Sequence, residues 1–235
     1  MVNTANRPAL GPAAAGSPAG YEQPFWRRAG AVWRQLAGSI FRDGFSFEWH
    51  ELQPPANLNW ANSFHPASVE ICLNLQGAGW VIAEGTRIEI GPDTAVFFGL
   101  NGGYLKAGRL AGQRHQFLSV EFSLAFLQQR LALHALHLHP LVQRCLAGAA
   151  PVAGVSDVTP LTHRHRDLLN SLLHPPVLAS AQRLWYESKA LEFAAGFFFF
   201  ASETEPLCTR AQKLAAERVA RAKAALLENL AEAPA

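Results

Sequence analysis

The 235-residue sequence predicts an α+β protein, in which a small antiparallel β-barrel or sandwich is followed by a helical region. Two observations predict this order. Between residues 45 and 122, apolar residues mostly alternate with polar ones, and glycine, proline or asparagine separates the short runs. From residue 123 onward, apolar residues recur every three or four positions, which is the period of an amphipathic helix.

The alternation is clearest at residues 45–50, which read FSFEWH and predict a half-buried strand. Residues 58–64 alternate in the same way, with Trp60, Asn62 and Phe64 on one face. Turn residues then separate further short runs that favour strands, at 69–75, 80–83, 86–90, 94–98 and 115–122. Before this region, residues 24–36 are expected to form a short helix.

Capping signals indicate where the later helices begin. Ser123 is suited to cap a helix, and Pro140 suits the first position of another. After a loop at 147–155, Thr159-Pro160 predicts the start of a third helix, which stops before Pro175. A longer helix is expected at 177–201, and Thr209 with Gln212 forms a capping-box pair that opens the last one.

Composition excludes several classes of protein. Hydrophobic residues make up 49% and charged residues 16%, which allows a sizeable core and argues against a disordered chain. The net charge of +2 gives no strong electrostatic case for nucleic-acid binding by the whole chain. The apolar run 193–201 is far shorter than the roughly 20 residues that span a bilayer, so no membrane segment is expected.

The three cysteines are widely spaced, which gives no disulfide framework or zinc spacing and fits a reducing cytoplasm. The first 20 residues are rich in alanine, glycine and proline and lack the apolar run of a signal peptide, so a disordered leader is expected.

Two stretches resemble a known family. The first reads CLNLQGAGWVIAEGTRIEIGPDTAVFFG and, further on, RHQFLSVEFSLAF, and it is similar to the cupin-like (jelly-roll type) sensing barrel of AraC-type transcription regulators. The second reads LWYESKALEFAAGFFFF and then ERVARAKAALLENLAE, and it resembles the helix that ends this sensor and the first helix of the DNA-binding domain. The subgroup typified by the regulator of pyochelin uptake is the most similar.

The resemblance implies a division of the chain into a leader (1–20), a cupin-like ligand-sensing barrel (21–123), a helical dimerisation region (124–205) and the first helix of a DNA-binding domain (206–235). Such a DNA-binding domain has two helix-turn-helix units, and only its first helix is expected here. The implied function is effector sensing in a homodimer that contacts DNA only through that missing domain. An aromatic or siderophore-like effector is implied, but neither its identity nor activation versus repression follows.

A small barrel of this kind can hold one ligand among apolar walls and a few placed polar groups. Asn62 and Asn74 are informative, since an amide inside a barrel needs hydrogen-bond partners. The alternative is that the aromatic residues simply fill the barrel. The expected effector-binding residues are Trp60, Asn62, Phe64, Asn74, Trp80, Phe98, His115 and Glu121.

No metal, cofactor or catalytic residue is expected. Both His-x-His pairs, 137–139 and 163–165, fall in helical or loop segments, where residues two apart diverge by roughly 200° around the helix axis. No nucleophile motif or phosphate-binding loop is present. Two alternatives to a regulator stay open: a stand-alone cupin enzyme, and a dimerising binding protein with no DNA contact.

A dimer interface is expected on the third helix. Leu161, His165, Leu168 and Leu172 are spaced four, three and four residues apart, which is typical of a packing seam between helices. The alternative is that this seam packs inside its own subunit.

Overall fold

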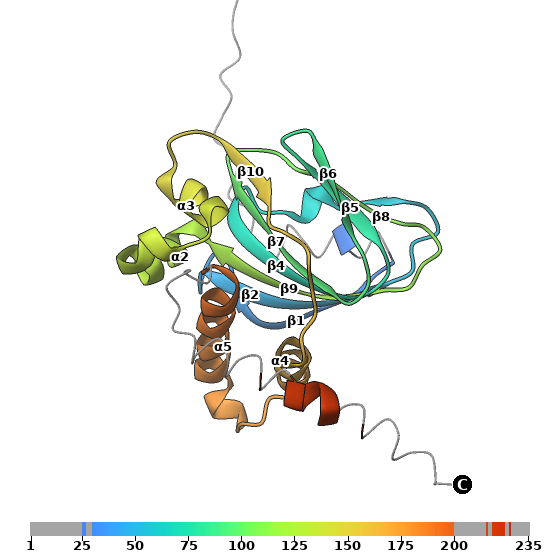
Figure 1. Ribbon diagram of the computed structural model, residues 1–235. Helices are drawn as coiled ribbons and strands as arrows, with labels where there is room; N and C mark the ends of the chain where they lie inside the picture. The colour runs from blue at the N-terminus through green and yellow to red at the C-terminus, as the bar shows by residue number, and fades with distance from the viewer. Residues whose placement is uncertain (1–24, 27–29, 200–214, 216–217, 224–225, 227–235) are drawn as a thin grey trace, which may run out of the picture.

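The computed structural model describes residues 25–26, 30–199, 215, 218–223 and 226. Two antiparallel sheets face each other, and helices cover the outer face of the larger sheet (Figure 1). The α+β class, with an antiparallel barrel-like pair of sheets and helices after most of the strands, is thus confirmed.

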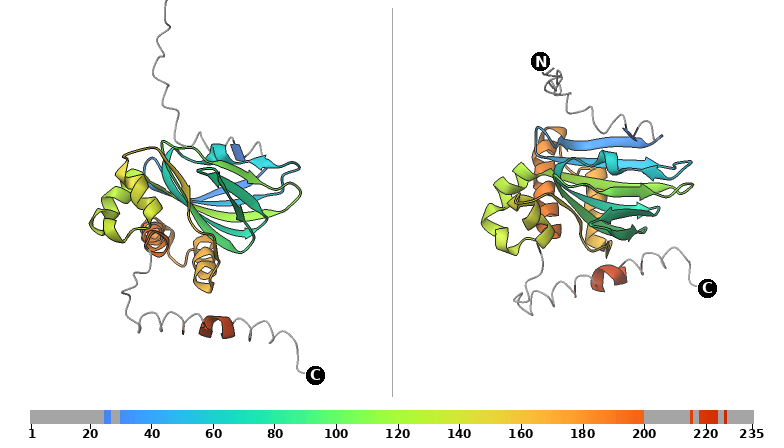
Figure 2. Two further views of the ribbon diagram at one scale, coloured as in Figure 1. Left: turned by 45° about the horizontal axis from the view of Figure 1, so that its top comes forward. Right: turned by 90° about the horizontal axis from the view of Figure 1, so that it is seen from above.

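The larger sheet has the order β1-β2-β9-β4-β7-β10, with β11 also paired to β7, and Figure 2 shows β1 at its outer edge. The smaller sheet has the order β3-β8-β5-β6. The strands are β1 (Val32–Ser39), β2 (Phe45–Leu52), β3 (Leu58–Asn59), β4 (Ala67–Gln76), β5 (Gly79–Ala83), β6 (Thr86–Ile90), β7 (Thr94–Asn101), β8 (Lys106–Arg109), β9 (His115–Ser123), β10 (Val152–Val155) and β11 (Thr159–Pro160).

The helices are α2 (Leu124–Leu131), α3 (Pro140–Ala147), α4 (His163–Leu173) and α5 (Gln182–Phe197), with 3-10 turns η2 (Ala61–Ser63), η3 (Ala132–His137) and η4 (Ala179–Ala181). Two expected starts are confirmed. The Ser123 hydroxyl accepts a hydrogen bond from the Phe126 amide at 3.2 Å, and Pro140 occupies the first turn of α3.

Successive side chains of β2, β4 and β9 point to opposite faces of the large sheet, so they contribute to two separate cores. The odd residues of β2, such as Phe45 and Phe47, pack with the helices on the outer face of the large sheet. The even residues of β2, such as Glu48 and His50, lie on the other face, toward the small sheet, and are buried as well. The expected half-buried strand is therefore buried on both faces, because the small sheet covers the polar side.

Several expected elements differ from the structure. Residues 32–36, the last part of the expected helix 24–36, belong instead to edge strand β1, because pairing with β2 from Val32 to Ser39 supplies the backbone hydrogen bonds of this strand. Residues 61–63 form a 3-10 turn, flanked by Trp60 and Phe64, instead of a continued strand. The expected loop at 147–155 contains β10, which pairs with β7.

The third helix also begins later than expected. Thr159-Pro160 pairs with β7 as β11, and α4 starts at His163 after Thr162, whose hydroxyl accepts from the His165 amide at 3.3 Å. Strands β10 and β11 therefore lie inside the region that was expected to be helical, and both pair with β7 of the large sheet. The expected leader and Thr209 lie outside the described residues, and within the expected last helix the described residues 215, 218–223 and 226 are helical.

Candidate functional site

A polar chamber lies inside the barrel, between the two sheets. It is a cavity of about 10 Å³ lined by Trp26, Glu48, His50, Ser63, Glu70, Ser119 and Glu121. This volume is just about enough for one water molecule, so side chains nearly fill the chamber as it stands.

The register of three neighbouring strands brings these side chains together. Glu70 of β4 lies directly opposite Glu121 of β9, and Glu48 of β2 lies opposite Ser119 of β9. Residues opposite each other on antiparallel strands have their side chains on the same face. Three carboxyl groups from distant parts of the sequence therefore meet on the inner face of the large sheet.

Each carboxyl group has partners within the barrel. Glu121 Oε2 lies 2.7 Å from His65 Nδ1, and the Ser119 hydroxyl donates to Glu70. Glu48 accepts hydrogen bonds from Trp33 Nε1 at 2.9 Å and from the Ser46 hydroxyl at 3.1 Å.

Burial and mutual repulsion set the protonation of this chamber. Burial, and then the charge of Glu121, raise the pKa of Glu70 well above its usual value, so the Glu70 carboxyl holds a proton more readily. Burial lowers the pKa of His65, but the hydrogen bond and charge of Glu121 outweigh it and raise that pKa overall. Burial lowers the pKa of His50 to about 4, so its ring is neutral near pH 7.

Four buried atoms at the chamber have no hydrogen-bond partner among the described residues: Trp26 Nε1, both ring nitrogens of His50, and Glu121 Oε1. His50 Nε2 does lie 3.8 Å from a Glu48 oxygen, which is too long for a hydrogen bond. A buried polar group left unsatisfied costs about 1–3 kcal/mol, so such groups normally have a partner. These four atoms are the polar groups through which the chamber could bind a polar molecule.

An aromatic cluster with one buried cation fills the rest of the barrel. The Arg109 guanidinium lies over the Trp60 ring at 4.5 Å and over the Phe117 ring at 4.1 Å. Its Nη1 donates to Asn74 Oδ1 at 2.6 Å, and Nη2 lies 3.6 Å from Cys72 Sγ. Burial lowers the pKa of Arg109 from its usual value. This end of the barrel is packed, but Trp60 Nε1 and Arg109 Nε also have no hydrogen-bond partner among the described residues.

The expected effector-binding residues fall into different places. Glu121 lines the chamber, and the buried Trp60 and Phe98 contact the half-buried Phe64 inside the barrel. Asn74 is buried too, but its amide donates to the Gly77 and Gly91 carbonyls and accepts from Arg109, so it needs no ligand.

Three of the expected residues do not reach the chamber. Asn62 is exposed, because the 3-10 turn rotates it away from Trp60. Trp80 lies on the outer face of β5, where Arg87 stacks on it at 4.8 Å, while its neighbour Val81 points inward. His115 is buried at the far end of β9 from Glu121, and its Nε2 lies 2.8 Å from the Leu110 carbonyl.

Sequence reasoning missed Glu48, His50, Glu70 and Arg109. Glu48 and His50 lie in an expected strand, but the alternation of residues 45–50 predicts that they lie on its polar, solvent-facing side. Only the position of the small sheet shows that this face is buried. Arg109 lies in β8, whose sequence KAGR has no strand-like alternation, so no local signal could have found it.

The expected dimer seam packs within its own chain. Leu168 is 9% exposed and Leu172 is fully buried, and both belong to the core between the large sheet and the helices. Tyr186 of α5 donates to the Leu172 carbonyl at 2.8 Å. His165 stacks on Phe197 of α5, with 5.0 Å between the ring centroids. His165, Leu168 and Leu172 therefore all have contacts within their own chain.

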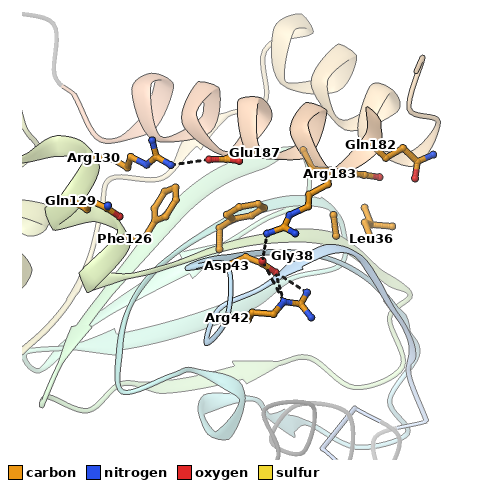
Figure 3. Close-up of a pocket in the computed structure, with 13 residues that line it drawn as sticks. Leu36, Gly38, Arg42, Asp43, Phe126, Gln129, Arg130, Gln182, Arg183 and Glu187 are labelled. Atoms are coloured by element: carbon orange, nitrogen blue, oxygen red, sulfur yellow. Dashed lines mark hydrogen bonds and ion pairs between the residues drawn. The ribbon is translucent and has the colours of Figure 1, made fainter. Parts of the chain in front are cut away.

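A second hollow lies outside the barrel, between the β1–β2 turn and helices α2 and α5 (Figure 3). We call it the α5 groove, and its volume is about 450 Å³. Asp43 accepts from Arg42 at 2.9 Å and from Arg183 at 3.5 Å, and Arg130 pairs with Glu187 at 2.8 Å. The groove is thus large enough for a ligand, but its charges already pair with one another.

Within the part of the chain that the structure describes, no three His, Cys, Asp or Glu side chains are arranged to hold a metal ion. None of the described helices is long and apolar enough to cross a membrane.

Comparison with solved structures gives partial similarity to several proteins, two of which are cupin domains. A putative glyoxylate-induced protein from Pseudomonas aeruginosa is 18% identical, with a TM-score of 0.32, and the alignment covers 40% of this chain and 34% of that one. The cupin domain of Schizosaccharomyces pombe Cnp3 is 13% identical, with a TM-score of 0.34 and coverages of 43% and 71%. A cupin domain of an XRE-family transcriptional regulator from Enterobacter cloacae is 18% identical, with a TM-score of 0.31 and coverages of 39% and 95%.

No curated protein matches the chain. The chain spans about a third of the length of the Pseudomonas aeruginosa protein that it matches. A family model does match most of the sequence: the N-terminal domain of the regulatory protein PchR, over residues 29–216. This range includes every strand and helix described above from β1 to α5. The chain therefore belongs to the family of PchR N-terminal regulatory domains.

Proposed function

We propose that this regulatory domain senses a small molecule in the barrel chamber and passes the signal to a helix-turn-helix domain of the AraC type. The observation that carries the proposal is the set of unsatisfied buried atoms on Trp26, His50 and Glu121. Buried polar groups without partners are rare in proteins, and a bound ligand is one way to satisfy them. Control of DNA binding requires that the domain acts in the cytoplasm.

The architecture supplies a route from the chamber to the helices. Strand β2 presents Glu48 to the chamber and the adjacent Phe47 to the opposite face of the sheet. The Phe47 ring contacts Tyr186 and Phe193 of α5, at centroid distances of 5.6 and 5.9 Å. A ligand that shifts β2 would therefore change the packing of α5. Couplings of this kind are typically worth about 1–3 kcal/mol, or roughly 5–150-fold in affinity.

Native mass spectrometry tests the proposal. The domain is incubated with a small-molecule extract of the organism that encodes it. The sample is then desalted, and the mass of the intact complex is measured. We expect a stoichiometric adduct on the wild type that is lost from Glu121→Leu, whose folding is checked by circular dichroism. The matched control Glu187→Leu, in the α5 groove, keeps the adduct. No adduct, or an adduct that Glu187→Leu removes and Glu121→Leu keeps, would contradict the proposal.

We also propose that the domain works as a homodimer, since paired subunits let two DNA-binding domains reach paired half-sites. Its interface does not involve Leu168 and Leu172, which are buried in the chain itself. Sedimentation gives the mass directly, and a monomer at all concentrations would rule the dimer out.

A further inference from the structure

We infer that the effector is an organic acid, whose carboxylate is bound inside the barrel by Arg109 and by the indole N–H groups near it. This inference rests on the proposed function, because it names the chemical class of the effector that the barrel senses.

Arg109 is a buried cation without an acidic partner. Its side chain is fully buried, yet its described hydrogen-bond partners are the Asn74 amide oxygen and the Cys72 sulfur, and its Nε has none. Glu70 is the described acid that acts on the charge of Arg109, but the pKa of Glu70 is raised, so its carboxyl holds a proton more readily than usual. A buried charge is costly unless an opposite charge pairs with it. A carboxylate would supply that charge and accept the hydrogen bond of Nε in one contact.

The side chains around the Phe117 ring bring further donors without acceptors. The Trp26 and Trp60 rings lie 5.9 and 6.0 Å from this ring. The His50 ring stacks on it at 4.4 Å, and the Arg109 guanidinium lies over it at 4.1 Å. Each of these four side chains has at least one buried nitrogen with no hydrogen-bond partner among the described residues. The two indoles and the guanidinium can only donate, so what this part of the barrel lacks is mainly an acceptor.

The acids that line the chamber oppose an anion less than three free carboxylates would. Glu121 pairs with His65 at 2.7 Å, and Glu48 accepts a hydrogen bond from Trp33 Nε1. The Glu70 carboxyl, when it holds its proton, is a donor as well. The remaining acceptor is Glu121 Oε1, which calls for a hydroxyl or N–H group elsewhere on the same ligand.

A carboxylate needs more room than the barrel leaves around these groups. The chamber beside Trp26 and His50 holds about 10 Å³, which is about one water molecule. The ligand must therefore displace at least one ring. Trp26 packs on Phe117 and belongs to neither sheet, so these two rings can shift together without breaking a strand pair.

The test uses three probes of matched size that differ in charge: propionate, propanamide and n-propylammonium. Each is titrated at pH 7 and constant ionic strength while the indole N–H signals of the six tryptophans are followed by NMR. Trp26→Phe and Trp60→Phe identify the two signals of interest. The variant is Arg109→Met, and the matched control is Arg87→Met, which removes a guanidinium that stacks on Trp80 at 4.8 Å outside the barrel. Circular dichroism checks the fold of both.

We expect propionate to shift the Trp26 and Trp60 signals saturably, with a dissociation constant in the millimolar range. Propanamide binds roughly tenfold more weakly or less, because its hydrogen bonds are not charge-assisted, and n-propylammonium leaves both signals unchanged. Arg109→Met removes the preference for propionate over propanamide, and Arg87→Met keeps it.

Four results would overturn the inference: equal binding of propionate and propanamide, binding of n-propylammonium, no saturable shift with any probe, or unchanged propionate binding by a folded Arg109→Met. The comparison of the probes on the wild type decides by itself if Arg109→Met does not fold. The extract experiment is separate, since an adduct of a compound without an acidic group would refute the anion and leave the sensor standing.

Discussion

Gly77 and Gly85 share a backbone conformation but differ in what surrounds them. Both have φ of +81°, where a side chain is strained. A Cβ on Gly85 would meet nothing within 4 Å, whereas a Cβ on Gly77 would collide with the buried ring of His115. We expect Gly85→Ala to cost about 1–2 kcal/mol for the backbone alone, and Gly77→Ala to cost about 1–3 kcal/mol more. Denaturant unfolding measures the loss of unfolding free energy in both variants. Equal losses would mean that the His115 ring can shift at little cost.

Glu70 gives a pH-dependent prediction. Burial and the charge of Glu121 raise its pKa in the folded state well above the usual 4.5. Above pH 4.5 the unfolded chain releases this proton while the folded chain keeps it, so the carboxyl lowers stability increasingly until the folded pKa is passed. Glu70→Gln removes that effect and still accepts from Ser119.

We therefore expect Glu70→Gln to gain melting temperature over the wild type at pH 8 and to gain much less at pH 5. Glu48, Glu121 and Arg109 also face this carboxyl, and they are present in both proteins, so the comparison isolates the effect of Glu70. An equal difference at both pH values would mean that the Glu70 pKa is not raised.

At the scale of elements, the two outer helices differ in which leucines they bury. Leu168 and Leu172 of α4 are in the core, whereas Leu184 and Leu191 of α5 are 73% and 36% exposed. We expect the double change Leu168→Glu with Leu172→Glu to unfold the domain, because two carboxylates would be forced into the core.

The control is Leu184→Glu with Leu191→Glu, which should stay folded because both charges reach water. Circular dichroism reports the fold of each variant. A folded protein after the α4 change would show that α4 does not pack on its own chain.

The spacing of apolar residues predicts which segments are helices or strands, but it does not predict what each segment packs against. The spacing of Leu161, Leu168 and Leu172 predicted a packed helix face, but spacing does not say whether the partner is the same chain or another. In β2 the alternation predicted a strand, but not that both faces are covered. Residues 32–39 have no helix-breaking residue before Gly38, and only their pairing with β2 reveals a strand.

At the scale of the whole molecule, the large sheet carries a different environment on each side. Its inner face holds the chamber and its outer face holds the helices, both built on β2, β4 and β9 (Figure 1). The sequence predicted the barrel and the helices in the correct order. It could not predict the acidic chamber, because Glu48, Glu70 and Glu121 meet only through the register of three strands that are distant in sequence.

If the effector binds inside the barrel, as proposed, its binding should protect the strands that line the chamber and not the α5 groove. Amide hydrogen exchange, compared with and without the compound retained from the extract, distinguishes the two places. We expect slower exchange in β2, β4 and β9 around Glu48, Glu70 and Glu121. Protection confined to the groove, at residues 36–43 and along α5 near Arg183 and Glu187, would contradict it.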